Sequence, residues 1–246
     1  MQLIRDFGKF IAWLPDIFSK PENWTMYYKE TIRQMYDIGV GSMPIVMLIS
    51  GFIGAVTAIQ FSYQLSGSMI PRYYIGYIVR DIMLIEMAAT LSCIVLAGKV
   101  GSTMAAEIGG MRQKEHIDAM EIMGVNTSAY LVMPKMVASV IIIPLLVSIA
   151  FIVGIGGGYV AAVFVADLTN WEFEKGLRFL FDSYNVTIMY VKAVTFAFII
   201  TSVACFQGYF VTGGSIELGH ASTRAVVYGS IIILVADLVI ALLLMG

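Results

Sequence analysis

Residues 136–166 read MVASVIIIPLLVSIAFIVGIGGGYVAAVFVA, and no charged residue occurs between Lys135 and Asp167. A helix needs about 20 apolar residues to cross the hydrocarbon core of a bilayer, so this run is long enough to span a membrane. Of all 246 residues, 59% are hydrophobic and 13% are charged, and the mean hydropathy is +0.85. A soluble domain typically has about 45–50% apolar and roughly 25% charged residues. The composition therefore excludes a soluble enzyme and indicates a membrane protein with several spans.

Four further apolar runs predict four more membrane-spanning helices. The five predicted spans cover residues 43–63, 74–98, 135–167, 187–211 and 225–245. An odd number of spans places the two termini on opposite sides of the membrane. We expect an all-α integral membrane protein with a single domain over residues 1–246. Within it, residues 1–42 would form amphipathic and elbow helices, and residues 43–246 a five-helix bundle.

Lysine and arginine are distributed unevenly between the two sides of the predicted membrane. Ten of the 15 fall on the side of the N-terminus: Arg5, Lys9, Lys20, Lys29, Arg33, Lys99, Arg112, Lys114, Lys135 and Arg224. Because cytoplasmic segments carry an excess of these residues, we predict a cytoplasmic N-terminus and a periplasmic C-terminus. No long basic, Ser-rich leader is visible, which favours a bacterial inner membrane over an organelle. The net charge of −2 predicts no nucleic-acid partner.

The first 42 residues have the pattern of helices outside the bilayer core. Apolar residues recur at helical spacing between Leu3 and Phe18, and the charged residues fall largely on the other side. The pattern favours a helix in the headgroup plane with Trp13 as an interfacial anchor. A helix packed on the protein itself is the alternative. We expect Pro15 and Pro21 to separate it from a second helix over residues 22–37.

The predicted cytoplasmic loop over residues 99–135 contains a second amphipathic segment. Residues 115–123 predict a short helix, and Gly124 is expected to end it. Its side chains form an acidic row and an apolar row: Glu115, Asp118 and Glu121, beside Ile117, Met120 and Met123. Such a helix is typical of one that docks into a partner's groove, although packing against its own bundle explains the pattern equally well.

The stretch over residues 86–127 is EMAATLSCIVLAGKVGSTMAAEIGGMRQKEHIDAMEIMGVNT. It resembles the pattern ELGPVLxALLxAGRxGxAxAAELGxMxxTEQIDALExMGVDP of the MlaE (YrbE) family of ABC-transporter permeases. The resemblance continues in GFIGAVTAIQ (51–60), FQGY (206–209) and GHASTRAVV (219–227). It covers nearly the whole chain except an outer loop over about residues 167–184. The chain departs from the family where Ala88-Ala89 replaces Gly-Pro, so we expect the second span to be less kinked.

The resemblance implies the membrane subunit of a larger transporter that moves phospholipids between the inner and outer membranes and maintains outer-membrane lipid asymmetry. A homodimer of the chain would bind two cytoplasmic ABC ATPase subunits, a periplasmic MCE-domain (MlaD-like) protein and a small STAS-like subunit. Residues 115–123 would form the coupling helix that contacts the ATPase. The chain contains no G-x-x-x-x-G-K-[ST] loop. We therefore expect a non-catalytic subunit with no cofactor of its own, and ATP and Mg in the partner ATPase.

Charged residues inside the predicted spans are candidates for function because burying them in a bilayer is costly. Glu86 matches the glutamate of the family's Glu-Leu-Gly-Pro motif, and it either faces lipid or an opposing cation, or bonds to a neighbouring helix. Lys192 either receives a lipid phosphate or extends to the headgroups. Asp237 is expected to pair with a Ser, Thr or Tyr of an adjacent helix, and Glu107 with Arg224. The expected lipid contacts are Gln60, Tyr63, Met83, Glu86, Met87 and Lys192.

Two other classes of protein fit the sequence less well. An intramembrane enzyme needs a nucleophile with a base, or clustered metal ligands. The two histidines, His116 and His220, have no such partners in the sequence, and Cys93 and Cys205 lie in apolar runs. We predict no catalytic and no metal site. An ATP-independent lipid carrier or a membrane scaffold subunit stays as the alternative, although a carrier would favour inverted repeats that five unequal spans do not supply.

Overall fold

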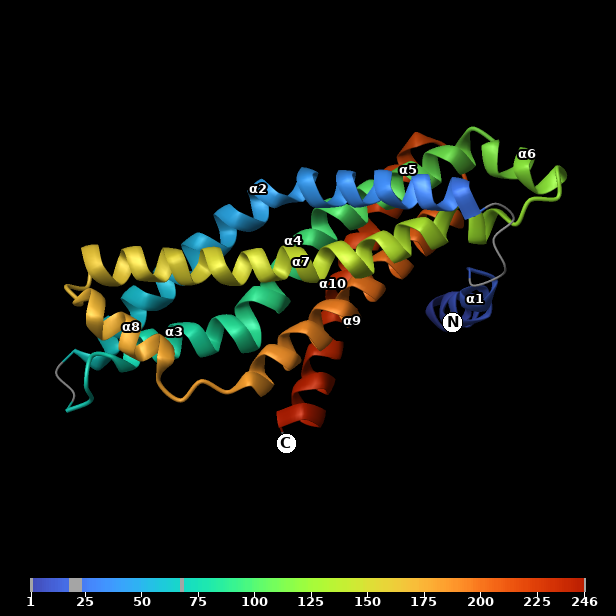
Figure 1. The fold of residues 1–246 in the computed structure, drawn as a ribbon. Coiled ribbons are helices and arrows are strands. Elements are labelled where there is room, and N and C mark those ends of the chain that lie inside the picture. Colours follow the sequence, from blue (N-terminus) through green and yellow to red (C-terminus); the bar gives the residue numbers. More distant parts are fainter. Residues whose placement is uncertain (1, 18–23, 67–68, 246) are drawn as a thin grey trace. The chain divides into compact units, whose positions relative to one another are not determined.

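A computed structural model describes residues 2–17, 24–66 and 69–245, which form helices and connecting turns with no strand among them (Figure 1). The helices are α1 (Gln2–Ile17), α2 (Trp24–Leu65), α3 (Tyr74–Ile82), η1 (Met83–Leu91), α4 (Ser92–Leu96), η2 (Ala97–Gly101), α5 (Ser102–Gln113), α6 (His116–Ile122), α7 (Thr127–Phe164), α8 (Asn170–Arg178), α9 (Ser183–Tyr209) and α10 (Ser215–Met245). The segments η1 and η2 are π-helical.

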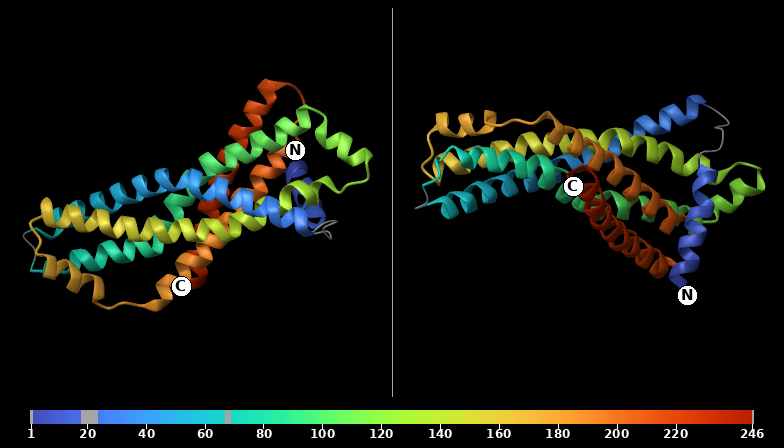
Figure 2. Two further views of the ribbon diagram at one scale, coloured as in Figure 1. Left: turned by 45° about the horizontal axis from the view of Figure 1, so that its top comes forward. Right: turned by 90° about the horizontal axis from the view of Figure 1, so that it is seen from below.

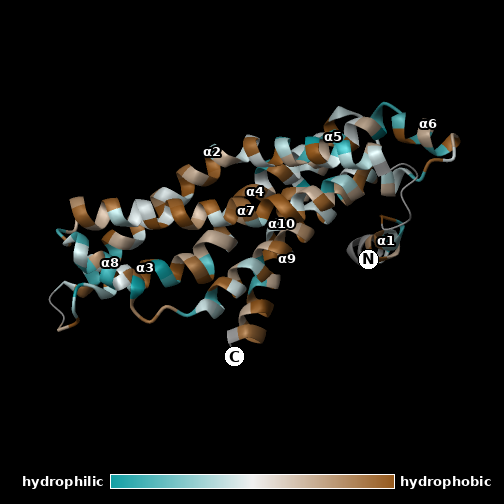
Figure 3. Ribbon diagram, viewed as in Figure 1, coloured by the Kyte–Doolittle hydropathy of each residue, from teal (hydrophilic) through white to brown (hydrophobic). Residues whose placement is uncertain are grey.

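Five helical stretches are long and apolar enough to cross a membrane, as the sequence predicts. They are Thr25–Leu65, Tyr74–Gln113, Thr127–Phe164, Ser183–Tyr209 and Ser215–Leu244. The second stretch joins α3, η1, α4, η2 and α5 into one helical run. Hydrophobic residues dominate α7 and α10, whereas α6 and α8 carry more hydrophilic ones (Figure 3). The all-α membrane fold is confirmed.

Several predicted boundaries were wrong. The cytoplasmic loop expected over residues 99–135 is short, because α5 continues to Gln113 and α7 already begins at Thr127. The helix expected over residues 22–37, leading into the first span, is described from Trp24 onward as the first part of α2, which runs unbroken through Pro44. Pro15 lies inside α1, and Pro21 falls outside the described residues. Hydropathy marks the part of a helix that lipid solvates, whereas backbone hydrogen bonds carry the helix further.

Residue contacts divide the chain into two compact units that alternate along the sequence. The first unit contains residues 1–41, 96–142 and 197–233, and the second contains residues 42–95, 143–196 and 234–246. The helices α2, α4, α7, α9 and α10 contribute residues to both units. A single domain over residues 1–246 stays a prediction, and the two units are described separately below.

In the second unit, glycines let α2 and α7 approach each other closely. A Cβ atom at Gly54 would overlap the backbone carbonyl of Gly154, and a Cβ at Gly157 would overlap that of Gly51. Small residues at such crossings allow backbone-to-backbone van der Waals packing, which drives helix association in lipid. The two helices run side by side along this stretch in Figure 2.

In the same unit, a buried arginine joins α3 to the segment that follows α8. The guanidinium of Arg80 donates hydrogen bonds to the carbonyls of Leu177 at 2.7 Å, Phe179 at 2.8 Å and Leu180 at 3.2 Å. It also pairs with Asp81 at 2.6 Å. These contacts satisfy carbonyls at the end of α8 that have no partner within the helix. Arg80 therefore has a structural role at this end of the bundle.

In the first unit, α1 packs against the protein through Trp13. The indole Nε1 of Trp13 donates to Ser128 Oγ at 2.9 Å, and the side chain is 5% exposed. The ring lies against Phe206, Tyr209 and Phe210 of the α9 end. Of the two alternatives for this helix, packing on the protein itself accounts for Trp13, because a buried polar N–H needs a partner and the start of α7 supplies one.

Candidate functional site: an intramembrane charge cluster and the α6 helix

The most concentrated charge inside the spans surrounds Lys192, in the second unit. Lys192 lies on α9, and its side chain has no exposed surface. Its ammonium donates to Glu86 Oε1 at 2.8 Å and to the carbonyl of Ile85 at 3.0 Å, both on η1. It also lies 2.7 Å from Oδ1 of Asp237 on α10. The lysine thus connects three of the candidate spans.

The cluster combines one cation with two carboxylates. The Asp237 contact is an ion pair by distance without the direction of a hydrogen bond, because Asp237 Oδ1 has no hydrogen-bond partner among the described residues. The side chains of Glu86 and Asp237 are 40% and 15% exposed. Ionised groups are kept inside a low-dielectric environment by pairing. With all three ionised, the cluster carries a surplus negative charge whose accessible part is Glu86.

The backbone around Glu86 is π-helical, from Met83 to Leu91. π-helical turns are rare and occur frequently at functional sites. The second oxygen of Glu86 accepts from Thr90 Oγ1 only at a long 3.4 Å. Glu86 therefore retains capacity to accept a further hydrogen bond on its exposed side. Ala88 and Ala89, which stand where the pattern that the chain resembles has Gly-Pro, lie within this π-helical segment.

Two predictions about these charges were wrong. Asp237 was expected to pair with a Ser, Thr or Tyr, but it pairs with Lys192. Lys192 was expected to extend to the headgroups or meet a phosphate near the end of its helix, but its amine is fully buried against fixed acceptors. For Glu86, the alternative of an opposing cation on a neighbouring helix is present. Contact of Glu86 with lipid stays a prediction.

The other predicted lipid-contact residues differ in exposure. Gln60 and Tyr63 are exposed on α2, Tyr63 by 82%. Met87 is partly buried on η1. Met83 is fully buried, and its Cε occupies the space beside Gly154. Met83 thus packs inside the second unit, whereas Gln60 and Tyr63 have surface available to a ligand.

The second candidate site is α6, in the first unit. The predicted helix over residues 115–123 is present as His116–Ile122, and Glu115 precedes it in the left-handed region with φ of 59°. Two of the three acidic side chains turn toward the chain itself. Arg112 pairs with Asp118 at 2.8 Å and with Glu121 at 3.4 Å.

Glu121 is the most connected residue of α6. Its Oε1 accepts from Tyr209 Oη at 2.9 Å and from Thr127 Oγ1 at 3.3 Å, and these two hydroxyls lie 2.7 Å apart. Ile117 is buried, and Met120 is partly buried. The exposed apolar surface is Ile122, at 88%, with Met123, at 70%. Of the two alternatives for this segment, packing on its own bundle accounts for Asp118, Glu121 and Ile117.

A further predicted ion pair, between Glu107 and Arg224, was wrong. Glu107 Oε2 lies 2.6 Å from Lys135 Nζ, and Arg224 contacts Glu217 at 3.4 Å on its own helix. Lys135 is almost fully buried, so the Glu107 pair is the shielded one. Sequence reasoning missed Lys135 because it stood at the edge of a predicted span. In the sequence, such pairs are indicated only by opposite charges at similar depths of two predicted spans, as for Lys192 and Asp237.

Comparisons with known proteins agree with this architecture. The family described as "Permease MlaE" matches residues 31–243. A "Probable ABC transporter permease protein" of Rickettsia bellii is 33% identical over 98% of this chain and 92% of its own length. A protein of the same description from Rickettsia felis is 34% identical over 87% of this chain and 83% of its own length. The "Intermembrane phospholipid transport system permease protein MlaE" of Haemophilus influenzae is 30% identical over 87% of this chain and 82% of its own length. With five candidate spans and these matches, the chain is a multi-pass membrane protein that belongs to the MlaE permease family.

Proposed function

We propose that the chain is the membrane-spanning subunit of an ABC transporter that moves phospholipids between the inner and outer membranes and so maintains outer-membrane lipid asymmetry. Family membership supports the transport class, and the similarity to the Haemophilus intermembrane phospholipid transport permease supports the cargo. The observation that carries the proposal is the charge cluster of Lys192, Glu86 and Asp237 within the spans. Such groups are costly in a bilayer and mark transport pathways.

In this proposal, Glu86 is the residue of the cluster that meets the polar part of the cargo. Glu86 is the most exposed of the three, and the hydrogen bond from the buried Lys192 ammonium positions its carboxylate. The positive-inside asymmetry supports a bacterial inner membrane location with the N-terminus in the cytoplasm. ATP and Mg act in a partner ATPase, since the chain carries no phosphate-binding loop motif. The other proposed partners are a second copy of the chain, a periplasmic MCE-domain protein and a small STAS-like subunit.

The proposed ATPase contact is the exposed apolar end of α6, Ile122 with Met123. Replacing both by Asp should detach the ATPase during purification while leaving the chain folded. A matched control is Ile216→Asp, which alters an apolar residue of similar exposure, 78%, at the start of α10. Equal loss of ATPase with the control would place the docking surface elsewhere. Reversing the acidic row is a poorer test, because Asp118 and Glu121 already bind Arg112.

Native mass spectrometry of the gently solubilised, tagged protein tests the whole proposal. A dimer of this chain with two ATPase chains and bound phospholipid is the expected result. Glu86→Gln should keep the assembly and lower the bound phospholipid. A chain that carries no ATPase would favour the alternative of an ATP-independent carrier or a scaffold subunit.

A further inference from the structure

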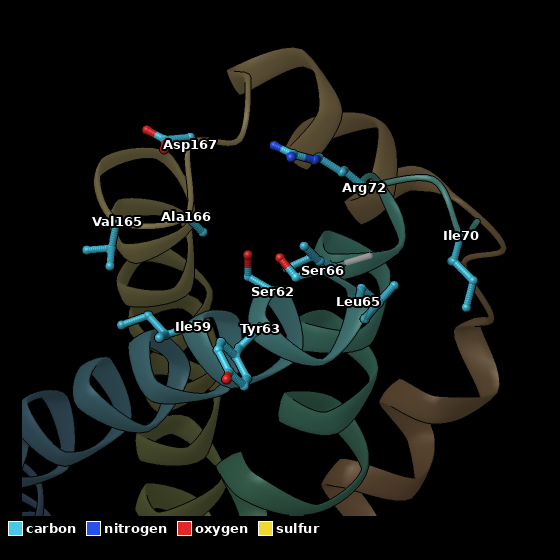
Figure 4. A pocket seen from close by; sticks show the side chains of 11 residues that line it. Ile59, Ser62, Tyr63, Leu65, Ser66, Ile70, Arg72, Val165, Ala166 and Asp167 are labelled. Carbon is cyan, nitrogen blue, oxygen red and sulfur yellow. The ribbon is translucent and has the colours of Figure 1, made fainter. Parts of the chain in front are cut away.

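A cavity of about 450 Å³ lies in the second unit, away from the Lys192 cluster. It is formed where α2 ends, where α7 ends and just before α3 begins (Figure 4). Its polar lining comes from Ser62, Tyr63, Ser66, Arg72 and Asp167, and its apolar lining includes Ile59.

The ends of the candidate spans beside the cavity predict that it lies at the depth of lipid headgroups. Two candidate spans end beside it, at Leu65 and Phe164, and a third begins at Tyr74. Because the ends of spanning helices lie at the membrane–water interface, residues that follow them directly meet headgroups rather than acyl chains. Arg72 and Asp167 occupy such positions, two residues before one span and three residues after another.

Two opposite charges line this cavity without pairing with each other. Arg72 and Asp167 have no ion pair with any residue in the described ranges 2–17, 24–66 and 69–245. Figure 4 shows Arg72 and Asp167 on opposite sides of the cavity, with the carboxylate of Asp167 directed away from Arg72 and the hydroxyls of Ser62 and Ser66 pointing into the space between the two residues. Such a lining fits a ligand that carries both charges, with its anionic group beside Arg72 and the hydroxyls and its cationic group beside Asp167.

The position of Asp167 is fixed by the turn that ends α7. Its φ is 50°, in the left-handed region that Asp tolerates better than most residues. The next residue, Leu168, donates its backbone N–H to the carbonyl of Ala162 at 3.1 Å. The backbone of Asp167 is therefore fixed at the rim of the cavity.

An apolar surface of α2 leads into the cavity. Leu48, Phe52, Val56, Ile59 and Tyr63 recur every three or four residues and are 60%, 67%, 58%, 41% and 82% exposed. This spacing places them on one face of the helix. Ile59 and Tyr63 belong both to this face and to the cavity lining. A ligand with a dipolar head in the cavity would have a continuous apolar surface for its chains.

We propose that this cavity binds the headgroup of a zwitterionic phospholipid that carries an amine. Arg72, with the hydroxyls of Ser62 and Ser66, binds the phosphate, and Asp167 binds the ammonium group. The acyl chains lie along the exposed face of α2. The proposal rests on phospholipid transport as the function and adds a preference for zwitterionic over anionic headgroups.

The test uses the full chain in detergent, titrated with phosphatidylethanolamine or phosphatidylglycerol of identical acyl chains and read by native mass spectrometry. The wild type should bind phosphatidylethanolamine about tenfold more tightly, as one charge-assisted hydrogen bond provides. Arg72→Gln should weaken both lipids, because both carry a phosphate. Asp167→Asn should weaken only phosphatidylethanolamine and so remove the preference.

Matched controls are Arg178→Gln and Glu174→Gln, which make the same charge changes at exposed positions of α8 outside this cavity. They should leave both affinities unchanged. Soluble glycerophosphoethanolamine should compete with the lipid, and the same concentration of inorganic phosphate should compete less. Equal competition by phosphate would mean that the site reads phosphate alone and would overturn the proposal.

Failure of this inference differs from failure of the proposed function. If the wild type binds both lipids equally and neither variant changes binding, the cavity is not a headgroup site, although phospholipid transport stands. If the wild type binds neither phospholipid, both proposals fail together.

Discussion

Lys192 illustrates at the scale of one residue why a buried cation in this protein depends on its partners. Its side chain has no exposed surface, and its ammonium lies within 3.0 Å of two carboxylates and a carbonyl. Replacing a whole buried ion pair by apolar groups is often tolerated, whereas removing one partner leaves a charge without compensation. Here removal of the lysine would leave the carboxylates of Glu86 and Asp237, on two different spans, without their shared cation.

Lys192→Met should therefore lower the free energy of unfolding by about 3–5 kcal/mol. Thermal unfolding of the detergent-solubilised chain measures the effect. Lys192→Met combined with Asp237→Leu should recover part of the loss, because the more buried of the two acids is then removed as well. Lys114→Met, at an exposed position, is the control and should unfold at the wild-type temperature. A Lys192→Met variant as stable as the control would contradict the reading of the cluster.

Trp13 shows the same dependence on a single partner in the first unit. Trp13→Phe keeps an aromatic ring against Phe206 and Tyr209 but loses the hydrogen bond to Ser128. The expected loss in stability is about 1 kcal/mol, and Ser128→Ala should cost a similar amount. In the double variant the two losses should not add, since both remove the same bond. Additive losses in thermal unfolding would mean that the hydrogen bond between Trp13 and Ser128 does not contribute to the free energy of unfolding.

At the scale of the element, two neighbouring glycines of α7 separate helix packing from helix propensity. A Cβ at Gly157 would overlap the carbonyl of Gly51 on α2, whereas a Cβ at Gly156 would meet nothing within 4 Å. Gly157→Ala should destabilise the protein by about 1–3 kcal/mol through overpacking. Gly156→Ala should be neutral or stabilise by up to about 1 kcal/mol, because alanine favours the helix. Equal unfolding temperatures for the two variants would show that α2 and α7 do not pack closely through this face.

At the scale of the whole molecule, the membrane-spanning helices could be predicted from the sequence, whereas the side-chain pairs between helices could not. The five spans can be predicted from the apolar runs, because an apolar segment in the bilayer core can satisfy its backbone hydrogen bonds within itself only as a helix. The position of α6 could be predicted from its amphipathic spacing. The partners of Trp13, Asp237 and Glu121 could not be predicted, because each depends on which helices become neighbours. The residues close in sequence to Trp13, Asp237 and Glu121 do not determine which helices become their neighbours.

Membrane orientation is the property of the whole molecule on which the roles of both sites depend. Ten of the 15 lysines and arginines fall on the side of the N-terminus, so that side should be cytoplasmic. Both native cysteines are buried, and replacing Cys93 and Cys205 by Ala gives a background without thiols. In this background, Lys114→Cys places a thiol between α5 and α6, and Glu174→Cys places one on α8, both at exposed positions.

In intact spheroplasts, a membrane-impermeant maleimide should label Glu174→Cys and leave Lys114→Cys unlabelled until the membrane is permeabilised. Ala193→Cys, at a fully buried position beside Lys192, should stay unlabelled in both conditions and controls for accessibility. The expected pattern puts α6 in the cytoplasm, where an ATPase is available, and the Arg72 cavity at the periplasmic interface. Labelling of Lys114→Cys in intact spheroplasts would mean that the orientation is opposite to the predicted one. In that case α6 could not serve as the site of ATPase coupling.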